Sequence, residues 1–250
     1  MRIIAVSGGK GGVGKTTLTA NLGVALTKLG FRTCIIDANF TAPDLATHFG
    51  IYPETTLWDV LKGKRSVEEA LYEHACGLHI IPGSMGVEEF NPQIYKRLRR
   101  KIRKLKYDFI VIDTPPGLGE DAKAALTPAN EVLLVANPEW TSLANAYRML
   151  QFALKRGKKV TGLVLNRVMV HEYEPHESMI ERVLGIPLVG KVPEDIYVRK
   201  SIAVQSPVVL LYPEAEASRE INRIAMKLGG ISYGEKREGI LRRILRFLGL

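Results

Sequence analysis

Residues 9–16 read Gly9-Lys10-Gly11-Gly12-Val13-Gly14-Lys15-Thr16, which satisfies the phosphate-loop pattern GxxxxGK[ST]. The apolar run IIAV at residues 3–6 precedes this loop, and residues 17–29 after it carry apolar side chains at helical spacing. Strand, glycine loop and helix therefore follow in the order that the pattern requires. Glycines let backbone N–H groups converge on phosphate oxygens, and the helix N-terminus adds positive partial charge. The sequence predicts a nucleotide site here.

Two side chains of this loop have separate expected roles. Lys15 neutralises charge on the β- and γ-phosphates, and the hydroxyl of Thr16 binds Mg²⁺. The alternative is a glycine-rich turn that holds no ligand. The expected nucleotide contacts of this region are Gly9, Lys10, Gly11, Gly12, Val13, Gly14, Lys15, Thr16 and Thr17.

Beyond the loop, short apolar runs alternate with segments of helical periodicity. Several runs are apolar on both faces, as buried parallel strands are. Strands that alternate with helices predict an α/β fold with a doubly wound, mainly parallel sheet and a P-loop nucleotide-binding core. The predicted strands are residues 3–6, 33–36, 79–81, 109–112, 132–135, 160–165 and 188–192.

Composition and charge narrow the class of protein. The chain has 250 residues, of which 46% are hydrophobic and 24% charged, and this excludes a mainly disordered or fibrous chain. Its two cysteines, Cys34 and Cys76, form no disulfide framework and predict a reducing compartment. No apolar run reaches the ~18 residues of a membrane span, and the phosphate loop begins too early for a cleavable leader. The net charge of +9 favours an acidic partner, nucleic acid or anionic lipid, for a cytoplasmic protein.

Lys10 is a second lysine inside the loop, and the general phosphate-loop pattern does not require it. With it, the loop resembles the KGGVGKT pattern of the deviant Walker A ATPases, the MinD/ParA family. The resemblance implies that Lys10 reaches across a dimer interface to the nucleotide of the other subunit. It also implies that the ATP-bound form is a homodimer. The alternative for Lys10 is a solvated loop lysine.

Three further positions resemble the acidic elements of this family. Asp113 ends the strand at 109–112 and matches the family's Walker B acid, which holds a magnesium-bound water, and Gly117 presents its N–H to the γ-phosphate. An aspartate before Thr-Pro also simply caps turns. Asp37 matches the first acid of the family's D-x-D pattern, near Mg²⁺. The implied metal ligands are Thr16, Asp37 and Asp113.

Asn39 departs from the family, because the second acid of that pattern orients the attacking water. An amide oxygen still accepts a hydrogen bond from water but lacks the stabilising charge. We therefore expect slow or absent ATP hydrolysis, and the alternative to a cycling ATPase is an ATP-locked, non-hydrolysing scaffold. The residues implied in catalysis are Lys10, Lys15, Asp37, Asn39 and Asp113.

Two strand ends resemble the family's base-recognition region. The amide of Asn166, in Leu165-Asn166-Arg167, is suited to pair with the adenine edge. Asparagine at a strand end is also a common turn former. The segment 192–195 is expected beside the base. The implied base contacts are Asn166, Arg167, Pro193, Glu194 and Asp195.

The C-terminal segment distinguishes between branches of the family. Cluster-binding branches need cysteines, but Cys34 lies in a predicted strand and Cys76 stands alone. This leaves ParA-like partition ATPases on DNA and MinD-like ATPases on membranes. On a helix, residues 239–250 place apolar and basic side chains on opposite sides, which suits anionic lipid. The apolar side carries Ile240, Leu241, Ile244, Leu245, Phe247 and Leu248, and the basic side carries Arg242, Arg243 and Arg246.

This segment resembles the membrane-targeting helix of MinD proteins, and its alternative is docking on the chain's own core or on a partner protein. We expect an ATPase domain at 1–228, a linker at 229–238 and a membrane-targeting helix at 239–250. The expected protein positions a cell-division or other complex from the inner face of the cell membrane. Residues 96–106 are a second basic segment, predicted as a surface helix because Leu98, Ile102 and Leu105, with Ile94 and Tyr95, form a narrow apolar stripe. The basic face of this helix is expected to contact DNA, lipid, an acidic partner or only solvent.

Overall fold

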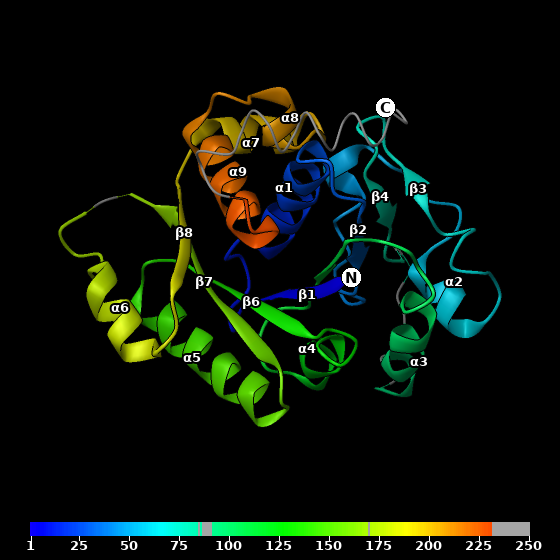
Figure 1. The fold of residues 1–250 in the computed structure, drawn as a ribbon, viewed down its shortest axis with the longest axis horizontal. Coiled ribbons are helices and arrows are strands. Elements are labelled where there is room, and N and C mark those ends of the chain that lie inside the picture. Colours follow the sequence, from blue (N-terminus) through cyan, green and yellow to red (C-terminus); the bar gives the residue numbers. More distant parts are fainter. Residues whose placement is uncertain (85, 87–91, 170, 232–250) are drawn as a thin grey trace.

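The computed structural model describes residues 1–84, 86, 92–169 and 171–231 (Figure 1). Within them an eight-stranded sheet has the order β3-β4-β2-β5-β1-β6-β7-β8, parallel except for the pair β3 and β4. The predicted fold class and all seven predicted strands are confirmed. The strands are β1 Arg2–Ser7, β2 Thr33–Asp37, β3 Tyr72–Glu73, β4 His79–Ile81, β5 Phe109–Asp113, β6 Glu131–Ala136, β7 Lys159–Val168 and β8 Leu188–Pro193. The two-residue edge strand β3 was not predicted, because it is too short to show a period.

Helices cover both faces of this sheet (Figure 1). One face carries α2 Leu57–Lys62, α3 Pro92–Ile102, α4 Glu120–Ala125, α5 Trp140–Lys155 and α6 Glu177–Leu184. The other carries α1 Lys15–Lys28, α7 Ile196–Ala203, α8 Val208–Leu211 and α9 Glu216–Gly229, with the short 3-10 helix Thr47–Phe49 beside them. The central strands therefore need apolar side chains on both faces.

Strand β1 shows how the sequence meets this need. Ile3 and Ala5 pack into the core under α2–α6, whereas Ile4 and Val6 pack into the core under α1 and α9. Each large aliphatic side chain buried in this way contributes roughly 1.5–3 kcal/mol. The carboxyl ends of parallel strands meet at one edge of the sheet, so the loops after β1, β2 and β5 lie together there.

The basic segment at 96–106 is helical only in part. Helix α3 ends at Ile102, not at Lys106, because the next residues turn with i to i−3 hydrogen bonds such as Leu105 N to Ile102 O. This tighter turn keeps Leu105 in the same core as Leu98 and Ile102. The predicted apolar stripe is thus confirmed for these three residues, and Arg99 is exposed.

The last described helix, α9, ends at Gly229, and Gly230 follows in the left-handed conformation at φ 68°. The break expected after Leu228 is therefore present. Residues 239–250, the predicted membrane-targeting helix, lie outside the described residues. Among those described, no helix is both long enough and apolar enough to cross a bilayer.

Candidate nucleotide site

The phosphate loop is held between β1 and α1 by close packing at two glycines. Gly14 precedes α1 at φ 91°, and a Cβ there would overlap the side-chain nitrogen of Asn166. That nitrogen donates to the carbonyl of Val13 at 2.8 Å, so the end of β7 is tied to the loop. A Cβ at Gly9 would overlap the backbone of Asn145 in α5. Only glycine fits these two positions without moving the neighbouring backbone or side chain.

Lys15 begins α1 as a buried cation. The residue is 7% exposed, and among the described residues its ammonium has no hydrogen-bond or ion-pair partner. Burial lowers the pKa of Lys15, while the charges of Asp113 and Asp44 act in the opposite direction. A buried cation without a partner is costly, and an anion such as a nucleotide phosphate removes that cost. The contact between Lys15 and phosphate stays a prediction, which this buried charge supports.

Oxygen ligands that suit Mg²⁺ lie beside this lysine. The hydroxyl of Thr16 donates to Oδ2 of Asp113 at 2.7 Å, and that of Thr19 approaches Oδ1 at 3.5 Å. Burial raises the pKa of Asp113 to about 7, although the hydrogen bond from Thr16 lowers it. Mg²⁺ prefers hard oxygen ligands and usually combines one or two carboxylates with phosphate oxygens and water. Thr16 and Asp113 fit that ion, and when bound it would neutralise charge on the phosphates.

Asp37 lies next to Asp113 across the pair β2 and β5 and is fully buried. Its Oδ1 accepts the backbone N–H of Asn39 at 3.0 Å, and its Oδ2 accepts that of Leu45 at 3.1 Å. Burial, and then the charge of Asp113, raises the pKa of Asp37. In this structure Asp37 holds the loop that follows β2, and its predicted contact with the metal stays a prediction.

Asn39 closes that loop on itself. Its Nδ2 donates to the carbonyl of Ala42 at 2.6 Å, and its Oδ1 accepts from Thr41 Oγ1 at 3.1 Å and from the N–H of Ala42 at 3.3 Å. Both ends of the amide are thus engaged within the loop. The structure places Asn39 as a loop-closing residue, and its predicted contact with the attacking water remains untested.

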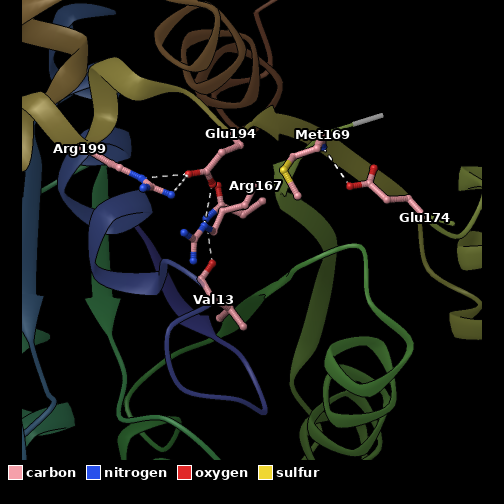
Figure 2. A network of polar contacts seen from close by, with 7 residues as sticks. Val13, Arg167, Met169, Glu174, Glu194 and Arg199 are labelled. Atoms are coloured by element: carbon pink, nitrogen blue, oxygen red, sulfur yellow. Dashed lines mark hydrogen bonds and ion pairs between the residues drawn. The ribbon is translucent and has the colours of Figure 1, made fainter. Parts of the chain in front are cut away.

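The predicted base contacts meet at one cavity of about 220 Å³ at the carboxyl ends of β7 and β8. Figure 2 shows the ion pairs along its wall, where Arg167 Nε lies 2.7 Å from Glu194 Oε2 and Arg199 Nη2 lies 2.7 Å from Glu194 Oε1. The hydrogen bond from Arg167 holds the pKa of Glu194 below its usual range. The predicted residues that line this cavity are Gly12, Gly14, Thr17, Asn166, Arg167, Pro193, Glu194 and Asp195.

Lys10 and Gly117 complete the set of predicted residues. The side chain of Lys10 is 47% exposed, and its Nζ lies 3.3 Å from Glu139 Oε2. Such an exposed ion pair contributes only about 0–1 kcal/mol, so little free energy opposes movement of Lys10 to another partner. Gly117 follows Pro116, whose side chain lies 3.7 Å from where a Cβ of Gly11 would be, and has φ 80°, which favours glycine.

Three residues of this site were not predicted from the sequence. Thr19 lies one helical turn after Thr16, a spacing that could have revealed it. Glu139 directly precedes α5, and no sequence pattern links it to Lys10. Asp44 acts electrostatically on Lys15, Asp37 and Asp113 from a loop that has no periodic pattern.

Known proteins are similar to this chain in sequence and fold. A family model described as an AAA domain matches residues 1–161. An uncharacterized ATP-binding protein of Methanocaldococcus jannaschii is 34% identical over 253 residues, which cover 98% of this chain and 96% of that protein.

Two solved structures extend the similarity. Septum site-determining protein MinD of Pyrococcus horikoshii, complexed with Mg-ADP, matches with a TM-score of 0.86 at 33% identity over 91% of this chain and 95% of that one. The MinC:MinD cell division complex of Aquifex aeolicus contains a chain that matches with a TM-score of 0.82 at 30% identity, over 93% and 97%. This chain therefore belongs to the MinD/ParA family of P-loop ATPases, on its MinD side, and is an ATPase that uses ATP and Mg²⁺.

Proposed function

We propose that this chain is a MinD-like positioning ATPase whose ATP-bound homodimer associates with the inner face of the cell membrane through residues 239–250. The observation that carries the proposal is Lys10, an exposed lysine at the rim of a phosphate loop whose own site already contains Lys15. A second, weakly held lysine is suited to a nucleotide bound by another subunit. The similarity to MinD proteins, one of them solved in a cell division complex, supports the positioning role.

The distribution of charge favours lipid as the partner of the C-terminal segment. Residues 235–250 carry five basic and two acidic side chains, and residues 96–106 carry eight basic and none acidic, so the rest of the chain is nearly neutral. Within 239–250 the arginines lie opposite an apolar arc on the predicted helix. Anionic headgroups attract the basic side, and acyl chains accept the apolar side.

Dimerisation would make the binding of residues 239–250 to the membrane depend on the bound nucleotide. Burial of one Leu, Ile or Phe side chain contributes roughly 1.5–3 kcal/mol, but ordering a free peptide costs about 1–2 kcal/mol per residue. One terminal segment therefore binds only marginally. Two segments on one dimer bind together, and effective concentration raises the avidity by about 10²–10⁴. ATP would thus recruit the protein by pairing its subunits.

Co-sedimentation with vesicles that contain phosphatidylglycerol tests this function. We expect binding with ATP to exceed binding with ADP by at least about tenfold, and deletion of residues 239–250 to abolish it. The matched pair is Ile244→Glu, inside the apolar arc, and Leu250→Glu, outside it. The first should lose binding and the second should keep most of it. Equal binding with ATP and ADP, or binding that survives the deletion, would reject the proposal.

A second candidate function, DNA binding of the ParA type, is favoured by the surface around α3. Arg99, Arg100 and Arg103 are exposed there. Burial, and then the charges of Arg99 and Arg156, lower the pKa of Lys158, so this basic surface continues to the end of α5. Contacts with phosphates weaken steeply with salt. Retardation of non-specific DNA that requires ATP and disappears with added salt would favour this function over the membrane.

A further inference from the structure

The loop after β2, residues 38–46, contains an asparagine and an aspartate with contrasting surroundings. Asn39 is 7% exposed, and its amide is occupied by Thr41 and Ala42, as described above. Asp44 is exposed, and among the described residues its carboxylate has no hydrogen-bond or ion-pair partner. Of these two side chains, the one without a partner is therefore the charged carboxylate of Asp44.

The backbone on either side of Asp44 is anchored to the nucleotide site. The N–H of Leu45 donates to Asp37 Oδ2 at 3.1 Å, and the Leu45 side chain is fully buried. The carbonyl of Asp44 itself accepts the N–H of Thr47 at 3.1 Å, at the start of the 3-10 helix. An anchored backbone limits the volume that the Asp44 carboxylate can reach.

The charge of Asp44 acts on the groups that surround the phosphate site. Burial and Asp113 are the larger influences, but Asp44 raises the pKa of both Lys15 and Asp37. It also raises that of Asp113, behind burial, Thr16 and Lys15. The same charge raises the pKa of His48 in the 3-10 helix, behind burial, which lowers it. The hydrogen bond from Leu45 to Asp37, the strand partner of Asp113, is what holds residue 44 at this end of the sheet.

We propose that Asp44 provides the water-orienting carboxylate for ATP hydrolysis that position 39 of this chain lacks. The inference rests on the ATPase assignment and adds a residue to it. A carboxylate oxygen of Asp44 accepts a hydrogen bond from the attacking water, which aligns the water oxygen with the γ-phosphorus. The new P–O bond forms as the bond to the β,γ-bridging oxygen breaks, and its electron pair stays on ADP. The water proton passes by way of the carboxylate to the phosphate, so the products are ADP and dihydrogen phosphate.

This role differs from a purely electrostatic one. If Asp44 only placed negative charge near the phosphates, its removal would strengthen ATP binding and leave the chemical step unharmed. A water-orienting role instead affects the chemical step, so kcat falls while KM stays constant or decreases. The value of kcat therefore separates the two roles, because it falls only if Asp44 orients the water.

Steady-state hydrolysis of Mg-ATP by the full chain on anionic vesicles tests the proposal. We expect Asp44→Asn to lower kcat about 10²-fold without raising KM, and Asp44→Glu to retain more activity than Asp44→Asn. The double variant N39D/D44N should recover activity, because it moves the carboxylate to the family position. Glu54→Gln, an exposed carboxylate beyond the same loop, is the control and should match the wild type.

Three results would overturn the inference. One is a kcat for Asp44→Asn within about twofold of wild type. Another is a loss confined to nucleotide binding, measured with a fluorescent ATP analogue. The third is a wild-type chain that binds ATP but releases no phosphate, which would instead favour the ATP-locked scaffold.

Discussion

Lys15→Met is expected to reduce kcat/KM for Mg-ATP by about 10³-fold or more, since it removes a preorganised cation from a dry phosphate site. Lys15 is 7% exposed and has no hydrogen-bond or ion-pair partner among the described residues, so nothing else holds its charge. Methionine has nearly the same length and no charge. Loss of the ammonium therefore removes phosphate stabilisation while the packing of α1 on the sheet is kept.

The same substitution should stabilise the protein without nucleotide. Burial lowers the pKa of Lys15, which means that the folded state disfavours the charged side chain. Lys15→Met removes that cost, so we expect an equal or higher melting temperature without nucleotide and no further rise with Mg-ATP. Lys155→Met, at the exposed C-terminal end of α5, is the control and should keep the wild-type response. Hydrolysis by Lys15→Met near the wild-type rate would contradict the assigned site.

Asp113→Asn should lower kcat by about 10²-fold, because it removes the negative charge that we expect to help hold the magnesium ion. The amide oxygen can still accept the hydrogen bond from Thr16, and the hydroxyl of Thr19 can accept one from the amide nitrogen, so the fold should be kept. Phosphate release and nucleotide binding, measured separately, distinguish loss of chemistry from loss of affinity. Binding of Mg-ATP by the wild type should also strengthen between pH 6 and 8, since a metal ligand must be deprotonated and burial raises the pKa of Asp113 to about 7.

Mg-ATP binding should strengthen as pH rises, but the stability of the protein without nucleotide should decrease. The pKa of Asp113 is raised in the folded state, so the folded protein binds more protons than the unfolded chain between pH ~4 and 7. The free energy of unfolding therefore decreases as pH rises through that window. Asp37 contributes with the same sign, because burial and Asp113 raise its pKa too. Urea unfolding should show a shallower decrease for Asp113→Asn, and an equally steep one would contradict the assigned pKa shift.

Much of the site was predictable because its residues follow strong local patterns. Lys15 and Thr16 belong to a loop pattern flanked by a strand and a helix, and Asp113 ends an apolar run. The contact between Asn166 and the carbonyl of Val13 was not predictable, since 153 positions separate the two residues and only the order of β1, β6 and β7 brings them together.

The loop after β2 and the end of α3 show a second limit on what the sequence can predict. Asn39 stands where the family has the second acid of its D-x-D pattern. The hydrogen bonds that its amide makes within the loop are local contacts, and no periodicity in the sequence predicts them. The position of Asp44 depends on the hydrogen bond that the N–H of Leu45 donates to Asp37. In α3 the apolar spacing indicated a helix to Lys106, but the tightened turn after Ile102 satisfies the same burial with a shorter helix.

Mixing two inactive variants tests the central claim, a dimer in which Lys10 of each subunit acts on the nucleotide of the other. Lys10→Ala lacks the lysine offered to its partner, and Asp113→Asn lacks a metal ligand of its own site. In an equimolar mixture, random pairing makes half of the dimers mixed, and each mixed dimer has one complete site. We expect the mixture to hydrolyse ATP at about one quarter of the wild-type rate. A mixture no more active than its two components would contradict it.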